Sequence, residues 1–379
     1  MSEFKASSFR DEFGNAGPDL VGITTMTSPY YFVPPSGSTG ERPSDPPPGM
    51  LRFNTDIGRL EVWRNDHWAT ILGESPNLGD QNAGTGESRV GTGTRGIFAG
   101  GNAPSLTNTI EYVSIPTLGD AHDFGNLTQT AYVGCGGCAS RTRGIRGGGS
   151  DGGGATDTID FVTIASTGNA TDFGNLTAVR KQLTALSNQT RGIFAGGYTP
   201  TAQNNIQSIE IASQGNAVDF GNLLAAAYGG AATSSSVRGV IMSGYASGNV
   251  NTVQYITIST TGNAQDFGDL TSARHYPATV FNATRSVFGG GSGNSDIIEF
   301  FTTATTGNAQ DFGDLATGSA ASFGMSSPIR GLFAGGNTPS FTDRIEFITI
   351  QTTGNGTDFG DMTTATAGAA SFSNGHGGL

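Results

Sequence analysis

One segment of the chain occurs six times in tandem, and this repeat restricts the possible folds more than any other feature of the sequence. Each copy begins with an arginine and ends with an Asp-Phe-Gly triplet. The six arginines are Arg95, Arg143, Arg191, Arg238, Arg285 and Arg330, at spacings of 48, 48, 47, 47 and 45 residues. The six triplets begin at Asp123, Asp172, Asp219, Asp266, Asp311 and Asp358. A period of roughly 40–50 residues that holds several short strands is typical of a β-propeller.

Each copy divides into four strand candidates, which we call strands a, b, c and d. In the last copy they are residues 320–326, 330–334, 345–350 and 358–362. No strand a precedes Arg95, but a matching segment, residues 367–374, follows the last strand d. We therefore expect residues 95–379 to form an all-β domain, a six-bladed β-propeller whose C-terminal strand completes the first blade. Closure of this kind would leave no open sheet edge.

Composition narrows the partners that such a domain can have. Glycine accounts for 60 of 379 residues, and the fixed period places the glycines at turns instead of in a disordered segment. The formal net charge of −12 would repel a phosphate backbone, so we expect no nucleic-acid partner. The sequence has no apolar run of about 18 residues, which predicts no membrane span. Its N-terminus also lacks the apolar stretch of a secretory signal.

The region before the repeat has a different character. Residues 1–49 are predicted to form an extended N-terminal arm, because residues 34–49 contain six prolines, which fix φ and withhold a hydrogen-bond donor. Residues 50–74 are predicted to form a small β-meander, and residues 75–94 a linker rich in Gly, Ser and Thr. The three strands of the meander are expected at residues 50–54, 59–64 and 67–71.

A meander of this size buries too little surface to fold without a partner. It contains both tryptophans of the chain. We expect it to pack on the propeller, on copies of itself or on another protein. The aromatic residues of the arm and the meander are therefore candidate binding residues: Tyr30, Tyr31, Phe32, Trp63 and Trp68.

Residues 18–72 carry a resemblance to a known class of proteins. The pattern RFNTDIGRLEVW, followed by a second tryptophan and preceded by the Pro-rich arm, resembles the N-terminal segments of tail-fibre and other virion structural proteins of tailed phages, cyanophages especially. The resemblance implies that this region anchors the protein to the virion while the C-terminal domain faces outward. It implies other virion proteins as partners, a homo-oligomeric or multi-copy symmetric assembly, and a host surface glycan as a further partner.

The repeat itself resembles the kelch repeat, which has an Arg-bearing strand, an apolar strand ending in Gly-Gly, an acid-bearing strand and then an aromatic residue. The likeness is strongest in TSARHYPATVFNATRSVFGGG, residues 271–291. The repeat departs from kelch because phenylalanine replaces the kelch tryptophan in every copy. The resemblance supports the propeller fold without indicating a particular kelch partner.

The repeated Asp-Phe-Gly triplet has a structural explanation. A kinase would also need a His-Arg-Asp catalytic loop and a Gly-rich loop before a lysine strand, and the sequence has neither. We expect the Phe to pack between blades, the Gly to permit a turn and the Asp to bond local backbone N–H groups. Pairs of acids three residues apart, such as Asp266 with Asp269, leave a structural calcium ion as an alternative.

The repeated arginine could pair with an acid in strand c. The acids considered are Glu111, Asp160, Glu210, Glu299 and Glu346, with Gln254 breaking the series. Folding strand b onto strand c about residue 105 places Ala99, and not Arg95, opposite Glu111. We therefore expect no Arg–acid bridge within a hairpin, while a bridge between adjacent blades stays open.

The sequence offers no catalytic constellation, so we expect neither an enzyme nor a cofactor or metal site. The four histidines are scattered, and the Gly-rich segment 147–154 precedes no helix and contains no lysine. Cys135 and Cys138 are expected to be small buried side chains, with a redox pair or metal site as alternatives. Catalysis would require residues that break the repeat, namely Arg146, Arg180, Lys181, His275 and Tyr276.

The variable loops between strands b and c are the second group of candidate binding sites. They are rich in Asn, Ser, Thr and Pro with a few aromatic residues, which suits contact with sugar hydroxyls or a protein surface. The candidate residues are Asn102, Tyr198, Tyr245, Asn337 and Phe341. A carbohydrate-binding lectin with one sugar per blade is therefore an alternative to a purely structural virion protein. A glycan-cleaving enzyme is a third alternative, which would need paired carboxylates near the central channel.

Overall fold

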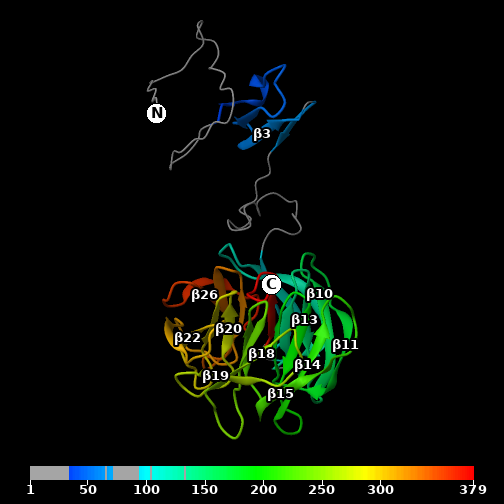
Figure 1. Ribbon diagram of the computed structural model, residues 1–379, viewed down its shortest axis with the longest axis vertical. Coiled ribbons are helices and arrows are strands. Elements are labelled where there is room, and N and C mark those ends of the chain that lie inside the picture. The colour runs from blue at the N-terminus through cyan, green and yellow to red at the C-terminus, as the bar shows by residue number, and fades with distance from the viewer. Residues whose placement is uncertain (1–33, 65, 71–93, 103–104, 132–133) are drawn as a thin grey trace. The chain divides into compact units, whose positions relative to one another are not determined.

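The computed structural model describes residues 34–64, 66–70, 94–102, 105–131 and 134–379. The chain forms two compact units, residues 1–74 and 75–379 (Figure 1). We call their described parts the N-terminal module, residues 34–70, and the C-terminal domain, residues 94–379. Both are all-β, and the described residues contain only one short helix, the 3₁₀ helix η1 (Thr39–Glu41).

The described part of the C-terminal domain consists of six four-stranded antiparallel sheets with a propeller-like arrangement. The a strands are β8 (Gly136–Ala139), β12 (Thr184–Ser187), β16 (Ala231–Ser234), β20 (Ala278–Phe281), β24 (Phe323–Ser326) and β28 (Ala370–Ser373). The b strands are β5 (Arg95–Ala99), β9 (Arg143–Gly147), β13 (Arg191–Ala195), β17 (Arg238–Met242), β21 (Arg285–Gly289) and β25 (Arg330–Ala334). In Figure 1 the colour passes from cyan to red as the chain moves from one sheet to the next.

The c and d strands complete each sheet. The c strands are β6 (Thr107–Ser114), β10 (Thr156–Thr163), β14 (Gln203–Glu210), β18 (Thr252–Thr257), β22 (Ile297–Thr302) and β26 (Arg344–Thr349). The d strands are β7 (His122–Ala131), β11 (Thr171–Arg180), β15 (Val218–Ala227), β19 (Gln265–Asp269), β23 (Gln310–Asp314) and β27 (Thr357–Asp361). We number the sheets 1 to 6 by the order of their b strands.

Sheet 1 combines the two ends of the domain. Its order is β28-β5-β6-β7, so the last strand of the chain pairs with the first strand of the repeat. Ala370 lies opposite Ala99, and Phe372 lies opposite Ile97. Beyond the strand, the Asn374 side chain accepts a hydrogen bond from the Arg95 backbone N–H at 2.8 Å. The other five sheets are each built from four consecutive strands.

The apolar core lies between consecutive sheets, because the strands present apolar side chains on both faces. Each of the six core clusters of this domain draws its residues from two neighbouring sheets. One cluster joins sheet 6 to sheet 1, with Leu332 and Phe359 packed near Phe98 and Val113. The phenylalanines of the triplet are all buried in these clusters: Phe124, Phe173, Phe220, Phe267, Phe312 and Phe359.

The glycine of the triplet is required by a close approach between neighbouring sheets. Gly125 has φ +148°, and a Cβ built on it would lie 2.4 Å from the Gly168 carbonyl oxygen of the next sheet. Beside it, the Asn169 side chain accepts a hydrogen bond from the Asn126 backbone N–H at 3.0 Å. The aspartate of the triplet is exposed in each copy. A backbone bond of the kind expected from the aspartate is made instead by a side chain of the neighbouring sheet, an asparagine in five copies and Asp120 in the sixth.

The repeated arginines join the sheets through main-chain carbonyls, and not through the Arg–acid bridge between adjacent blades that the sequence left open. In each copy the guanidinium donates to a carbonyl oxygen just after strand c of the next sheet. These pairs are Arg95 to Ile164, Arg143 to Ile211, Arg191 to Ile258, Arg238 to Thr303, Arg285 to Ile350 and Arg330 to Ile115. The carbonyls at a strand end need donors, and a guanidinium with five N–H groups supplies them at a fixed geometry.

The register of the b–c hairpin also differs from the expected one. Phe98, and not Ala99, lies opposite Glu111, a shift of one residue. The same register makes Gln207 the equivalent of Glu111 in sheet 3, so Glu210 does not belong to the acid series. Glu210 instead lies directly opposite Arg191, and their side chains are 3.4 Å apart at the surface. This hairpin therefore does pair its repeated arginine with an acid, contrary to expectation.

The N-terminal module is a four-stranded sheet in the order β1-β2-β3-β4. Three strands form a meander near the expected positions: β2 (Leu51–Asn54), β3 (Arg59–Trp63) and β4 (Trp68–Thr70). The fourth, β1 (Ser36–Gly37), runs parallel to β2. Residues 36–41 are thus not purely extended as expected for the arm. They form β1 and η1 because β2 offers a free edge and because polar side chains hold η1 on the sheet.

Candidate functional site

The sheet of the N-terminal module has one polar and one apolar face, because side chains alternate along a strand. Arg52, Asn54 and Glu61 share the polar face with both tryptophans, since Arg52 lies opposite Glu61 and Trp63 opposite Trp68. Leu51, Phe53, Leu60, Val62 and Ala69 point to the other face.

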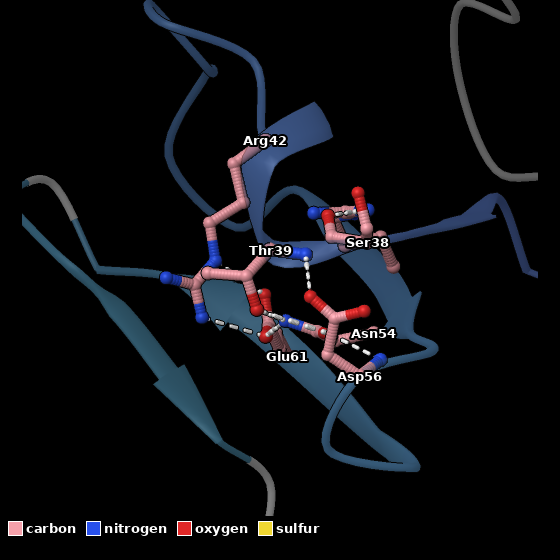
Figure 2. Close-up of polar contacts among 7 residues, drawn as sticks. Ser38, Thr39, Arg42, Asn54, Asp56 and Glu61 are labelled. Atoms are coloured by element: carbon pink, nitrogen blue, oxygen red, sulfur yellow. Dashed lines mark hydrogen bonds and ion pairs between the residues drawn. The ribbon is translucent and has the colours of Figure 1, made fainter.

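The polar face is the buried one. Glu61 and Asn54 are fully buried, and Arg52 is 5% exposed. Figure 2 shows how η1 and the residues around it cover this face. Arg42 binds the Glu61 carboxylate with two hydrogen bonds, Nε to Oε2 at 3.0 Å and Nη2 to Oε1 at 2.7 Å. Asn54 donates from Nδ2 both to Glu61 and to the Thr39 hydroxyl. The bonds from Arg42 lower the pKa of Glu61 below its ordinary value, so this buried group is a carboxylate.

The apolar face of the module is open. Leu51 is 36% exposed, and Phe53, Leu60, Val62 and Ala69 are only half-buried. The candidate residues Trp63 and Trp68 pack against each other on the polar side at a ring distance of 5.6 Å, also half-buried. The Arg52 guanidinium lies over the Trp68 ring at 5.8 Å. The two tryptophan rings thus cover each other in part, whereas the residues of the apolar face are half-buried or exposed. The candidates Tyr30, Tyr31 and Phe32 lie outside the described residues.

The a strands of the C-terminal domain line a central cavity of about 130 Å³. All six a strands contribute to its wall, and none of the described residues that line it is an Asp or a Glu. Paired carboxylates of the kind a glycosidase uses are therefore not found in this lining. Cys135 and Cys138 lie in the wall as free, buried thiols, and burial raises the pKa of Cys138 to about 12. A thiol with such a pKa is a poor nucleophile and a poor metal ligand.

A histidine from the C-terminal segment lies at the wall of this cavity. His376 is buried, and its Nε2–H donates to the Ala139 carbonyl at 3.0 Å. The Gly378 backbone N–H donates to Nδ1 at 3.1 Å, so Nδ1 must be an acceptor and the ring is neutral. Burial lowers the pKa of His376 to about 4. The segment fits tightly, because a Cβ on Gly378 would lie 2.0 Å from the Ser187 carbonyl oxygen.

A buried acid or amide in strand c links each sheet to the one before it. In the preceding sheet, a buried Leu or Met lies in strand d or just after it, and the residue that follows this Leu or Met donates a hydrogen bond to the side-chain oxygen. These pairs are Glu111 with Thr363, Asp160 with Thr128, Gln207 with Thr177, Gln254 with Leu224, Glu299 with Thr271 and Glu346 with Ala316. Arginine accompanies the acid in sheets 2, 5 and 6, and glutamine occupies the position in sheets 3 and 4.

The candidate residues of the b–c loops occupy equivalent positions. Asn102, Tyr198, Tyr245 and Asn337 each follow the glycines at the end of strand b, and each bridges back to its own loop. Phe341 is the residue to which Asn337 bridges. Of these candidates the structure brings Tyr198 and Tyr245 together, because the Tyr228 ring contacts both. Tyr228 was not among the residues predicted from the sequence. The bridge between Tyr228 and Tyr245 joins the start of strand a to the end of strand b, a pairing that local sequence patterns do not reveal.

Comparison with known proteins adds no family assignment. Neither the scan against protein-family models nor the search of curated proteins finds a match for this chain. Among the described residues, no group of three or more His, Cys, Asp or Glu side chains is arranged to hold a metal ion. The helix in the described part of the chain is far too short to cross a membrane.

Proposed function

We propose that the C-terminal domain is a six-bladed kelch-like β-propeller closed by its C-terminal strand. Three observations support closure: the pairing of β28 with β5, the core cluster shared by sheets 6 and 1, and the hydrogen bond from Arg330 to the Ile115 carbonyl. The a strands of consecutive sheets also contact one another in turn, and β28 contacts both β24 and β8.

We further propose that the protein is a virion structural protein of a tailed phage, associated with the tail or tail fibre and not an enzyme. Its N-terminal region attaches it to other virion proteins or to sister subunits, and its propeller is displayed for contact with the host surface or with neighbouring proteins. The observation that carries this proposal is the inverted burial of the N-terminal module. A sheet that buries Glu61 and Asn54 while exposing Leu51 and half-exposing Phe53 has its apolar face available for a partner. The resemblance of residues 18–72 to phage anchoring segments agrees with this use.

The proposal is tested by deleting residues 1–72 and by the single substitution Phe53→Glu in the full chain. Both changes should leave a folded C-terminal domain, judged by its far-UV circular dichroism and melting, and both should abolish incorporation into particles. The substitution Asp66→Asn, at an exposed position of the same module, serves as the matched control and should be incorporated normally. Normal incorporation of the deletion variant would refute the anchoring role.

A carbohydrate-binding lectin is the second candidate. The half-exposed tyrosines Tyr198 and Tyr245 favour it, since both lie at the ends of b strands in neighbouring sheets. The other described residues at this position are polar, Asn102, Ser150, Ser292 and Asn337. This distribution supports one localised site instead of one sugar per blade.

A further inference from the structure

Five aromatic side chains form a continuous series of ring contacts across sheets 3, 4 and 5. Tyr198 contacts Tyr228 at 5.3 Å between ring centroids, and Tyr228 contacts Tyr245 at 5.2 Å. Tyr245 contacts His275 at 5.6 Å, and His275 contacts Tyr276 at 4.6 Å. We call these five residues the aromatic arc. All five side chains are half-buried, so each ring has one part packed and another part at the surface.

The fold does not need these rings. Tyr228 and Tyr245 form a backbone bridge, and the same bridge occurs in sheet 6 between Ala320 and Asn337. In sheet 1 it occurs again, between Asn102 and Ala367. The polar and small residues at these equivalent positions show that the bridge forms without an aromatic side chain. The clustering of rings in three consecutive sheets therefore calls for an explanation other than folding.

The rings are held rigidly, as a binding surface requires. Tyr228 and Tyr245 exchange backbone hydrogen bonds at 3.0 and 2.9 Å, and the Tyr276 N–H donates to the Gly229 carbonyl at 2.7 Å. Tyr276 has φ +56°, the left-handed conformation that Gln182 and Ala321 adopt at the equivalent positions before their a strands, so a turn of the repeat fixes the direction of this ring. Its ring lies directly against Gly229, where an added Cβ would be 2.6 Å away. Gly229 thus makes room for the Tyr276 ring.

Polar groups flank the rings at both ends. Lys181 lies over the Tyr198 ring at 5.8 Å, and it is the one lysine within the described residues. At the other end the His275 Nδ1 is 2.7 Å from the Asn249 Oδ1, and the Asn249 Nδ2 donates to the Ser292 hydroxyl at 3.2 Å. Burial lowers the pKa of His275, so its ring is neutral at pH 7. The loops 196–203 and 243–251 contain no Asp or Glu, although the chain carries a net charge of −12.

We propose that the aromatic arc binds an oligosaccharide. Amphipathic rings present flat apolar faces on which the C–H faces of sugar rings can stack, while amides and hydroxyls beside them take up the sugar hydroxyls. Tyr276 also lines the central cavity, so one end of the ligand lies at the edge of this cavity. Lys181 lies at the opposite end of the arc, where it adds attraction for an acidic sugar. The inference deepens the proposed function, because it names a glycan as the host-surface partner of the propeller.

The test uses the purified full-length chain on an array of defined bacterial O-antigen and capsular oligosaccharides, both neutral and uronic-acid-containing. We expect the wild-type protein to bind a subset of them. Tyr228→Ala and Tyr245→Ala should each weaken that binding about tenfold or more, as the loss of a central aromatic contact does. Tyr228→Phe should retain it, and the matched control Asn337→Ala, at the equivalent position of sheet 6, should not change it. Lys181→Ala should weaken the binding of acidic oligosaccharides only.

Three outcomes would overturn the glycan site: no binding by the wild-type protein, unchanged binding in both alanine variants, or an equal loss in Asn337→Ala. Circular dichroism of each variant excludes unfolding as the cause of a loss. Particle incorporation, measured on the same variants, separates this inference from the proposed function. Tyr228→Ala should be incorporated normally, whereas the deletion of residues 1–72 should retain glycan binding and lose incorporation.

Discussion

The two described units of this protein bury opposite kinds of side chain. The C-terminal domain buries phenylalanine, isoleucine and leucine between consecutive sheets, in six clusters that repeat with the sequence. The N-terminal module buries Glu61, which Arg42 binds from just after η1, and Asn54, which Thr39 binds from η1. It leaves Leu51 and Phe53 at least partly open to solvent. The contrast teaches that only the domain has a core of the kind that stabilises a fold on its own.

The difference has an energetic basis. Apolar burial contributes free energy in proportion to area, so a repeated apolar core grows more stable with each added sheet. A buried ion pair contributes little net free energy, because desolvation offsets most of the attraction, yet breaking it leaves an uncompensated charge. The module should therefore be marginally stable by itself and depend on its hydrogen bonds and on a partner for its apolar face. Four experiments test this contrast.

The largest effect is expected from deletion of residues 370–379. It removes β28 from sheet 1, exposes the edge of β5 and takes Phe372 out of the core. Loss of a buried phenylalanine alone costs about 3–5 kcal/mol, and the exposed edge adds to that cost. We expect the domain to melt at a much lower temperature or to aggregate, as measured by calorimetry. The tryptophan fluorescence of the module should not change, since both tryptophans lie there. A domain that melts like the wild type would refute closure by β28.

The next largest effect is expected from Glu61→Ala, which should unfold the module and spare the domain. The substitution leaves Arg42 without its carboxylate and Asn54 Nδ2 with only the Thr39 hydroxyl, and losing hydrogen bonds to a charged group costs about 2–3 kcal/mol. The free energy of unfolding of such a small sheet is too low to absorb this loss. We expect tryptophan emission to shift to longer wavelength at 25 °C while the calorimetric transition of the domain stays in place. Asp66→Ala, which removes an exposed carboxylate beside His67, is the control and should leave the emission unchanged.

A smaller, pH-dependent effect is expected from His376→Gln. The folded-state pKa of about 4 lies below the ordinary value of 6.5, so the unfolded chain takes up a proton between these values while the folded chain does not. The stability of the wild type should therefore fall by about 3 kcal/mol as the pH drops from 6.5 to 4, relative to a variant that does not titrate. Melting curves across this range measure the difference between the two proteins. His67→Gln, at an exposed site of the module, should leave the slope unchanged, and an identical slope in His376→Gln would contradict the burial of a neutral ring.

The same contrast explains how much of the structure could be predicted from the sequence. The strands of the C-terminal domain follow from local signals, because each copy repeats its glycines and its apolar residues at fixed positions. The pairing of residues 370–373 with β5 was expected from a count of strands alone. The hairpin register was wrong by one residue, and Glu210 was listed in the acid series although Gln207 occupies the equivalent position. A loop that is not symmetric about its centre shifts the register without leaving a mark in the sequence.

The module and the aromatic arc were harder to predict because they depend on contacts between distant residues. The alternation of side chains along β3 predicted that the strand has two different faces. It did not reveal that Arg42 covers the face that carries Glu61. Tyr198 and Tyr245 were candidates, whereas Tyr228 became visible only through its contacts with both. Periodicity predicts which side chains share a face, and it does not predict what covers that face.

The smallest effect is expected from Glu111→Gln, which tests whether the domain tolerates a buried charge at the position where sheets 3 and 4 carry glutamine. In the described part of the chain, no arginine pairs with Glu111, and burial raises the pKa of its carboxyl. Gln207 shows that glutamine fits, since its Oε1 accepts from the Thr177 backbone N–H at 2.8 Å and from its hydroxyl at 3.0 Å. Thr363 offers the same two donors to Glu111.

At pH 7 the Glu111→Gln variant should be as stable as the wild type or more stable by about 1 kcal/mol, because an unpaired buried charge is replaced by a neutral amide. A raised carboxyl pKa stabilises the folded state as the pH falls, so the advantage of the variant should disappear toward pH 4. Denaturant unfolding at both pH values measures this change. Glu346→Gln is the matched comparison, because Arg344 pairs with Glu346 and the same substitution there should destabilise the domain at pH 7. A loss of stability in Glu111→Gln as large as in Glu346→Gln would show that the domain, like the N-terminal module, relies on buried carboxylates.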